Sequence, residues 1–215
     1  MSSVEELRAW YREARASRVV DALKRRGYSA CYVPDAAAAR KKTLEIVPPG
    51  SLLATGGSMT LRQAGILDAL LDRGDHFITD PSLPYGAELL EQRRKALNCD
   101  VYLTSTNALT EDGVLVNIDG TGNRVASMVF GPRTVVIIAG VNKITADLDE
   151  AMLRARHYAA VLNAKRLNCD TPCATKGECL DCRSPGRICR VLTIMERCPA
   201  ETAVQVVLVG EELGF

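Results

Sequence analysis

The strongest constraint on the fold is a regular alternation of short apolar runs with longer amphipathic segments. Residues 134–139, Thr-Val-Val-Ile-Ile-Ala, are apolar almost without a break, which is typical of a central strand covered on both faces. Other strands are predicted at residues 30–33, 51–54, 76–79, 100–104, 191–195 and 203–209. Strands that alternate with helices predict an α/β fold, with a mixed, mostly parallel sheet and helices on both of its faces.

Helix signals fill most of the segments between these strands. A Ser-x-x-Glu capping box, formed by Ser3 and Glu6, begins the first helix. The predicted helices cover residues 4–26, 36–46, 60–73, 85–97 and 147–164. The chain of 215 residues fits a single α/β domain, residues 1–215, in which the Cys-rich residues 168–190 form an inserted loop.

Composition argues against two broad classes of partner. Lysine and arginine number 27 and aspartate and glutamate 26, so the net charge of +1 offers no general attraction for nucleic acid. No apolar run approaches the ~20 residues that a membrane span needs. The N-terminal segment has the pattern of a helix rather than an export signal, so we expect a cytoplasmic protein whose thiols stay reduced.

The densest group of polar residues with functional potential lies between residues 104 and 124. Two turn signals bracket the apolar residues 114–118, and the first signal is sufficient for a β-hairpin. The second turn carries more polar groups than a turn requires, and a helix is expected to follow it. We predict that this turn forms one wall of a small-molecule site, made by Asp119, Gly120, Thr121, Gly122, Asn123 and Arg124. The alternative is a helix N-cap followed by exposed side chains.

Loops that follow the parallel strands are expected to supply the other walls, because ligands of open α/β sheets bind beyond the carboxyl ends of the strands. The loop after residues 51–54 has the composition of an anion-binding cradle, since its glycines let backbone N–H groups turn toward a ligand. Its predicted ligand-binding residues are Thr55, Gly56, Gly57, Ser58, Thr60 and Arg62. The alternative is an ordinary turn and helix cap.

Three more candidate binding residues follow the next strands of the predicted sheet. Asn107 comes shortly after residues 100–104, and Asn142 and Lys143 follow residues 134–139. A lysine directly after a central strand is placed to project into the crevice. The alternative for Lys143 is a solvated lysine at the approach to a helix.

Catalytic groups of the common kinds are scarce in this chain. Of its two histidines, His157 lies off the apolar stripe of its predicted helix and His76 has no evident acidic partner. A Ser-His-Asp triad or a histidine-based metal site is therefore disfavoured. Acid–base chemistry would fall to Lys143, Asp119 or Glu111.

Five of the eight cysteines lie within residues 169–189, a loop by composition. The pair Cys179-x-x-Cys182 brings two thiolates within reach of one centre, which Cys173 and Cys189 would complete. Because no histidine is near, an all-thiolate metal site favours an iron–sulfur cluster of the 4Fe–4S type over zinc. A redox disulfide and plain reduced cysteines are the remaining alternatives.

Taken together, several of these segments resemble the LUD (lactate utilisation domain) family. The matching stretches are residues 104–124 with Phe130-Gly131-Pro132, residues 139–143, residues 162–166, the cysteine run and residues 209–214. The resemblance implies a fold similar to that of the sugar-phosphate isomerase and CoA-transferase superfamily. In that superfamily a Gly/Ser/Thr loop holds the anionic group of the ligand, and residues 55–60 occupy the matching position. The resemblance also implies a place in an iron–sulfur system that oxidises lactate to pyruvate.

Three functions follow as hypotheses from the sequence. The favoured one is an iron–sulfur protein of organic-acid metabolism that binds a small anionic hydroxy- or keto-acid in the crevice. The second is an isomerase- or hydrolase-like enzyme for a phosphorylated or CoA-linked substrate, with a structural cysteine loop that holds zinc or no metal. The third is a non-catalytic subunit of an electron-transfer complex, docked through its cysteine loop onto an oxidoreductase or another iron–sulfur protein.

Overall fold

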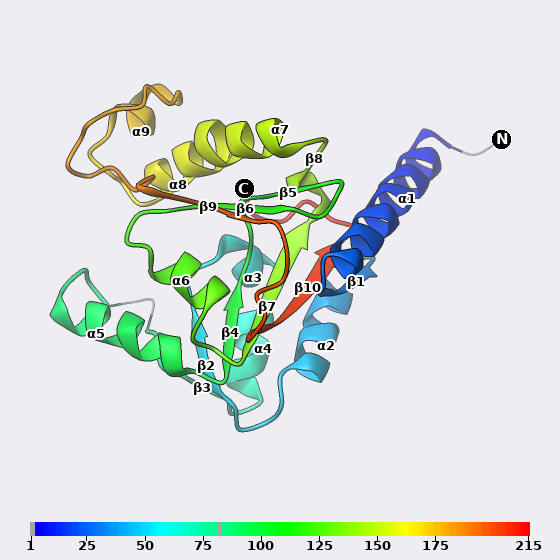
Figure 1. Cartoon of the computed structure of the whole chain (residues 1–215), viewed down its shortest axis with the longest axis horizontal. Helices are drawn as coiled ribbons and strands as arrows, with labels where there is room; N and C mark the ends of the chain where they lie inside the picture. The colour runs from blue at the N-terminus through cyan, green and yellow to red at the C-terminus, as the bar shows by residue number, and fades with distance from the viewer. Residues whose placement is uncertain (1–2, 81–82) are drawn as a thin grey trace.

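The centre of the molecule is a six-stranded sheet, seen in a computed structural model that describes residues 3–80 and 83–215. The strand order is β1-β10-β7-β4-β2-β3, and every neighbouring pair runs parallel (Figure 1). The strands are β1 (Ser29–Val33), β2 (Leu52–Thr55), β3 (His76–Phe77), β4 (Val101–Thr104), β7 (Thr134–Gly140) and β10 (Ala203–Val209). The most apolar strand, β7, lies between β10 and β4, which confirms its prediction as a central strand.

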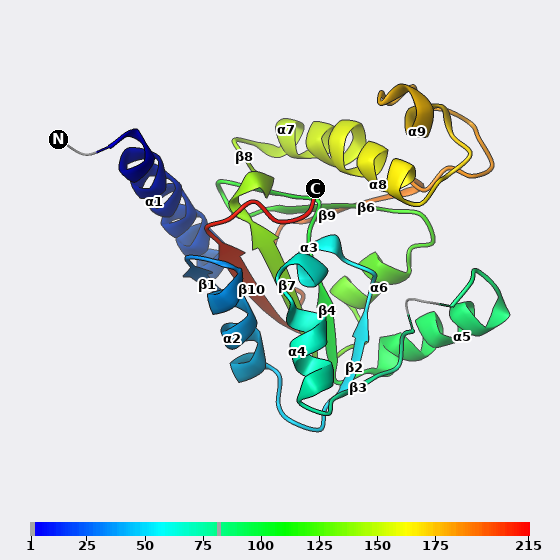
Figure 2. The ribbon, with the colours of Figure 1, turned by 180° about the vertical axis from the view of Figure 1, so that it is seen from behind.

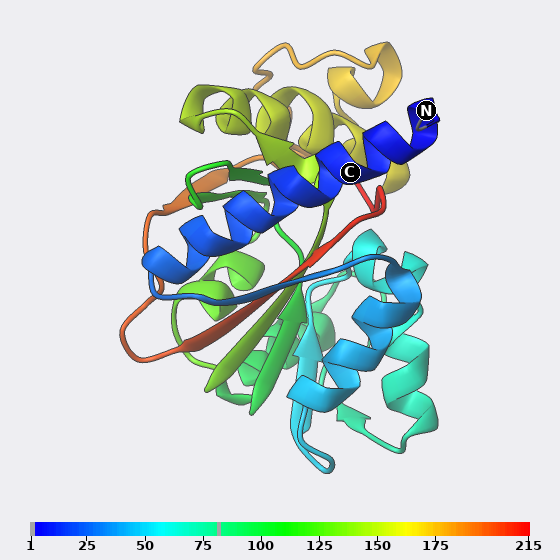
Figure 3. The ribbon, with the colours of Figure 1, turned by 90° about the vertical axis from the view of Figure 1, so that its right-hand side faces the viewer.

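Helices cover both faces of this sheet, as the alternation of strands and helices predicted. The α-helices in the described part of the chain are α1 (Val4–Arg25), α2 (Ala36–Ile46), α3 (Met59–Gln63), α4 (Ile66–Asp72), α5 (Ala87–Lys95), α6 (Asn123–Val129), α7 (Leu148–Leu153), α8 (Ala160–Arg166) and α9 (Pro172–Lys176). Helices α2, α3 and α4 lie on one face (Figure 2), and α1 and α6 lie on the other (Figure 3).

Side chains of β7 alternate between the two faces, because successive residues of a strand point in opposite directions. Val135 and Ile137 are buried in the core under α1 and α6. Val136 and Ile138 are buried in the core under α2, α3 and α4. This double burial accounts for the uninterrupted apolar run in the sequence of β7.

Two helix predictions differ from the structure at their interior. The segment 60–73 divides into α3 and α4 at Gly65, whose φ of +64° is a left-handed conformation that favours glycine. The segment 147–164 is helical throughout, but a π-helical turn, Arg154–Ala159, joins α7 to α8. Asp147 caps α7 as its sequence position indicates, accepting a hydrogen bond from the Glu150 N–H at 2.9 Å.

A second, four-stranded sheet was not predicted as a separate layer. It consists of β8 (Ile144–Thr145), β5 (Ala108–Thr110), β6 (Leu115–Asp119) and β9 (Val191–Met195), in that order. The predicted hairpin is present as β5 and β6, and β9 pairs antiparallel with the other edge of β6. The pairing continues into the cysteine loop, because the Arg190 N–H donates to the Asp119 carbonyl at 2.9 Å.

Helix α7, the π-helical turn and α8 form one continuous helical rod, called the α7–α8 rod below. Together with the second sheet, this rod forms a layer over the carboxyl ends of the parallel strands (Figure 1). Val116 and Ile118 of β6 pack against Ala151 and Ala155 of the rod in a third apolar cluster. The space between this layer and the end of the parallel sheet is where the predicted polar loops lie.

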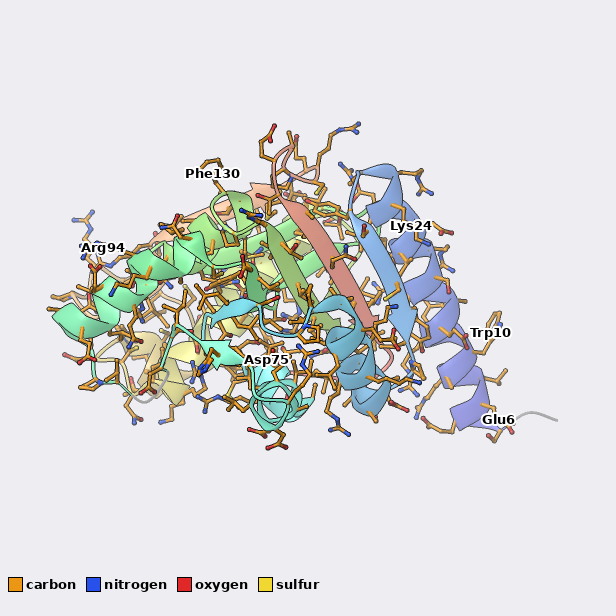
Figure 4. All side chains as sticks on the ribbon, turned by 90° about the horizontal axis from the view of Figure 1, so that it is seen from below. Glu6, Trp10, Lys24, Asp75, Arg94 and Phe130 are labelled. Atoms are coloured by element: carbon orange, nitrogen blue, oxygen red, sulfur yellow. The ribbon has the colours of Figure 1, made fainter. Side chains whose placement is uncertain are left out.

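Helix α1 extends past the edge of the sheet, and its first turns carry exposed apolar side chains. Trp10 is 66% exposed and projects away from the sheet (Figure 4). The predicted capping box is present, since the Glu6 N–H donates to Ser3 Oγ at 3.2 Å and the Ser3 N–H to Glu6 Oε2 at 2.6 Å. Across residues 3–80 and 83–215, no helix combines the length and apolarity needed to span a membrane.

Candidate functional site

A cavity of about 630 Å³ lies between the carboxyl ends of the parallel strands and the second sheet. Its walls come from segments that are far apart in the sequence. The predicted residues that line it are Thr55, Gly56, Gly57, Ser58, Thr60, Arg62, Asn107, Asp119, Gly120, Thr121, Asn123, Arg124 and Lys143. The strand-end rule therefore located the cavity, although it does not identify what the cavity binds.

The first wall is the loop after β2, and its glycines allow a close approach to neighbouring side chains. A Cβ atom on Gly56 would lie 2.8 Å from the Tyr102 hydroxyl and 3.2 Å from the Arg124 side chain. Gly57 has a φ of +73°, which favours glycine. Ser58 caps α3 by accepting the Leu61 N–H at 3.3 Å. The loop therefore turns sharply against Arg124 before α3 begins.

The inner wall is formed by Lys143, a lysine that is only 2% exposed. Its Nζ donates to Thr60 Oγ1 at 3.0 Å, to Ser105 Oγ at 3.0 Å and to the Thr106 carbonyl at 3.1 Å. Among the residues that the structure describes, no carboxylate lies within ion-pair distance of this amine. The amine is thus held only by neutral oxygens.

The surroundings of Lys143 disfavour its charged form. Burial, with a smaller contribution from the nearby cations Arg154 and Arg124, lowers its pKa to about 7. At neutral pH a large share of this amine is therefore unprotonated, with a lone pair that an ordinary lysine lacks.

Arg124 differs from Lys143, because it is only partly buried and its guanidinium is fully engaged. Its guanidinium donates to the carbonyls of Ser105 and Ile118 at 3.1 and 2.8 Å. It also donates to the side-chain oxygens of Asn117 and Asn107 at 2.7 and 2.9 Å. The arrangement fixes the hairpin to the loop after β4, which is a positioning role.

Asp119 stabilises both the second turn and Arg124. Its Oδ1 accepts the N–H groups of Thr121 and Gly122 at 3.0 and 2.9 Å, and its Oδ2 accepts the Val125 N–H at 3.3 Å. The same Oδ2 lies 3.7 Å from Arg124 Nε. The predicted alternative, a helix N-cap followed by exposed side chains, does not describe this turn, because the N-cap residue of α6 is Gly122 and Arg124 is held by hydrogen bonds.

Three predicted site residues lie outside the cavity lining. Glu111 is at the far end of the hairpin, where its Oε1 lies 2.7 Å from Arg15 Nε. Asn142 faces the C-terminal segment, donating to the Gly214 carbonyl at 3.2 Å and accepting the Leu213 N–H at 3.1 Å. Gly122 supplies a turn with a φ of +87°. We therefore remove Glu111 from the candidate acid–base groups of this cavity.

The lining also includes residues that the sequence analysis did not select. Ser105 and Thr106 contact Lys143, and their position beside Asn107 after a predicted strand was a usable signal. Arg93 and Arg166 add two cations to the lining. Nothing in the local sequence marks these arginines, because the folding of α5 and α8 toward the cavity is a tertiary feature.

The cysteine loop, residues 168–190, borders the cavity through Cys169 and Ile188. Arg187 ties the loop together by donating to the carbonyls of Cys182 and Cys189 at 2.7 and 3.0 Å. Burial raises the pKa of the Cys189 thiol, and the neighbouring thiols of Cys179 and Cys182 contribute to the increase.

The predicted ligands Cys173, Cys179, Cys182 and Cys189 match an all-thiolate centre in their chemistry. Across the described part of the chain, however, no three His, Cys, Asp or Glu side chains are grouped so as to hold a metal ion.

Comparisons with known proteins agree with this fold. A crystal structure of a DUF162 family protein from Deinococcus radiodurans is similar, with a TM-score of 0.54 and 13% identity over 93% of this chain and 98% of that one. At this identity the likeness concerns the fold alone. No curated protein matches the chain. The profile of the LUD domain matches residues 16–209, and the chain therefore belongs to the LUD domain family.

Proposed function

We propose that this chain is a lactate-utilisation-type protein that binds a small hydroxy- or keto-acid anion in the cavity. One observation carries the proposal: the Gly56–Gly57 loop, Arg62 and the amine of Lys143 meet around one hollow at the strand ends. Backbone amides and a guanidinium suit a carboxylate, and a buried amine suits a hydroxyl or carbonyl oxygen. Membership of the LUD domain family supports the same assignment.

The binding proposal is tested by thermal unfolding with lactate or pyruvate. A true ligand at 100 times its Kd adds about 2.7 kcal/mol to the unfolding free energy, so Tm rises with ligand concentration. Arg62→Gln should weaken the rise, because it removes the exposed guanidinium of the cavity rim. Arg8→Gln, on the exposed side of α1, is the matched control. The absence of a shift with every small acid would overturn the proposal.

We also propose that residues 168–190 carry an iron–sulfur centre held by Cys173, Cys179, Cys182 and Cys189. Four thiolates without histidine are the ligand set of such clusters, which when bound accept or donate one electron. Since oxidation of a hydroxy-acid releases two electrons, the proposal includes an oxidoreductase or iron–sulfur protein as a redox partner. Zinc is the alternative occupant of the same four thiolates.

Analysis of iron, zinc and acid-labile sulfide in anaerobically purified protein tests this centre. Iron and sulfide in equal amounts, with a brown colour that Cys182→Ser removes, are the expected result. Cys31→Ala, which changes a cysteine of β1 outside the loop, should keep both. Protein that holds neither iron nor zinc after reconstitution would contradict the centre.

The size of the cavity favours one further candidate function. Its volume of about 630 Å³ lies within the ~300–1,000 Å³ typical of sites for larger organic ligands. Arg62, Arg93 and Arg166 all line it, which suits a phosphorylated or CoA-linked substrate of an isomerase- or hydrolase-like enzyme. Tighter binding of a phosphorylated acid than of lactate, lost in Arg166→Gln, would favour this function over the first.

A further inference from the structure

Within residues 3–80 and 83–215, Lys143 is deeply buried and has no acidic partner, a combination that is rare for a lysine. A buried lysine that serves the fold is normally paired with a carboxylate, because an isolated buried charge is costly. Here the three contacts of Nζ are two hydroxyls and one carbonyl. Arg124, partly buried nearby, has both Asp119 and a full set of acceptors. Of these two residues, Lys143 is the one that has no charged partner among the described residues.

The position of the amine relative to the cavity supplies a chemical reason. Lys143 and both hydroxyl residues, Thr60 and Ser105, line the cavity wall. The loop of Gly56 and Gly57 lines the same cavity, where its amides can hold an anionic group. The anion-binding loop and the amine of Lys143 thus belong to one cavity, which is the arrangement that a ligand with an anionic group and a reactive carbon atom requires.

We propose that Lys143 forms a Schiff base with a carbonyl compound that carries an anionic group, such as a 2-oxo acid. The inference rests on the proposed binding of a small organic acid and goes beyond it by assigning covalent chemistry to one atom. Amines held away from water and beside other cations are the ones that react with carbonyl groups near neutral pH.

The step is balanced without any oxidant or reductant. The lone pair of Nζ adds to the carbonyl carbon, and the carbonyl oxygen takes up a proton to give a carbinolamine. The hydroxyl group then leaves as water, after gaining a second proton, and the carbon–nitrogen double bond forms. Thr60 and Ser105, each 3.0 Å from Nζ, are placed to pass protons between the nitrogen and the departing oxygen.

The electrostatic surroundings support this chemistry. Burial and the two arginines that lower the pKa of Lys143 to about 7 leave the amine nucleophilic at physiological pH. The charged groups around it are Arg124 on α6, Arg154 on the π-helical turn and Asp119, which faces Arg124. An imine that carries a positive charge is disfavoured by those arginines, so the anionic group of the ligand is required to balance it.

Reductive trapping tests the proposal directly. The full-length protein is incubated with pyruvate and cyanoborohydride, and intact mass and peptide mapping follow. The expected adduct has the mass of pyruvic acid less one oxygen atom, and it maps to the peptide that contains Lys143. Dihydroxyacetone phosphate in a parallel arm distinguishes a phosphate anchor from a carboxylate anchor. Acetone, which lacks an anionic group, should give no adduct at this peptide.

Two variants complete the experiment. Lys143→Met should abolish the mapped adduct, whereas Lys165→Met, which changes an exposed lysine of α8, should leave it unchanged. Because mapping in the native protein locates the adduct directly, the result does not depend on whether the Met variant folds.

The outcomes separate this inference from the binding proposal on which it rests. Thermal stabilisation by pyruvate without an adduct at Lys143 would overturn the Schiff base and leave the binding site standing. An adduct spread over surface lysines, equal with pyruvate and acetone, would also overturn it. If pyruvate gives neither thermal stabilisation nor an adduct, both the Schiff base and the binding site are contradicted.

Discussion

At the scale of single residues, Lys143 makes the stability of the protein depend on pH. Its pKa of about 7 in the folded chain lies below the ordinary value of 10.5, so between these values the folded state binds fewer protons than the unfolded state. Stability therefore rises with pH above about 7 and loses this contribution as pH falls to 7. Below pH 7 the amine of Lys143 is protonated in both the folded and the unfolded state, so its contribution to stability no longer changes with pH.

Lys143→Met should remove this slope. Relative to the variant, the native protein should gain up to about 1.4 kcal/mol of unfolding free energy for each pH unit from about 7 to about 9. Urea unfolding of both proteins across this range measures the difference. If the unfolding free energies of the two proteins change in parallel with pH, the pKa of the Lys143 amine is not lowered in the folded protein.

Gly140, the last residue of β7, has no room for a side chain. A Cβ atom there would lie 2.5 Å from the Glu211 carbonyl oxygen and 2.6 Å from the Leu213 nitrogen, both on the main chain. Gly140→Ala should cost about 1–3 kcal/mol, because the C-terminal segment must move. Gly86→Ala, whose new Cβ would be 3.9 Å from its nearest neighbour, is the control and should be nearly neutral in urea unfolding.

At the scale of elements, the cap of α7 holds the rod that covers the cavity. Asp147 accepts the Glu150 N–H, and Asp147→Ala should cost about 1 kcal/mol of unfolding free energy. Asp147→Asn keeps a side-chain oxygen at the cap and should lose only a few tenths. Thermal unfolding of the native protein and the two variants measures these losses. Equal losses of stability in Asp147→Ala and Asp147→Asn would show that the charge of Asp147, and not its hydrogen bond at the cap, is responsible.

The elements themselves were largely predictable, because their signals are local. Strands β9 and β10 and helix α2 have the predicted bounds. Gly65 was one exception: a glycine inside an apolar helical pattern is tolerated in many helices, and only its φ shows that it divides this one.

At the scale of the whole molecule, a bound centre should make the cysteine loop, residues 168–190, more resistant to proteolysis. Reconstitution with iron and sulfide should protect residues 168–190 from limited proteolysis, because four ligands would tie the loop together. The triple variant Cys179→Ser, Cys182→Ser and Cys189→Ser should stay sensitive, and Cys31→Ala should behave as the native protein does. Equal protection of the native protein and the triple variant would exclude these thiols as the cause.

Assembly of the two layers was not predictable from local patterns. β9 reads as one more strand of the parallel sheet, but it pairs with β6 in the second sheet. Its partner is set by the path of residues 168–190 and by the open edge of β6, which no local pattern records. The arginines of the cavity, Arg93 and Arg166, were missed for the same reason.

The sequence by itself determined the alternating strands and helices, the central place of β7 and the loops at the strand ends. These follow from hydrophobic period, capping residues and turn residues, all of which act over a few positions. Only the tertiary structure decided that Lys143 is buried without a carboxylate and that Glu111 lies elsewhere. Burial and charge partners depend on which distant segments meet, and those contacts alone set the reactivity of a side chain.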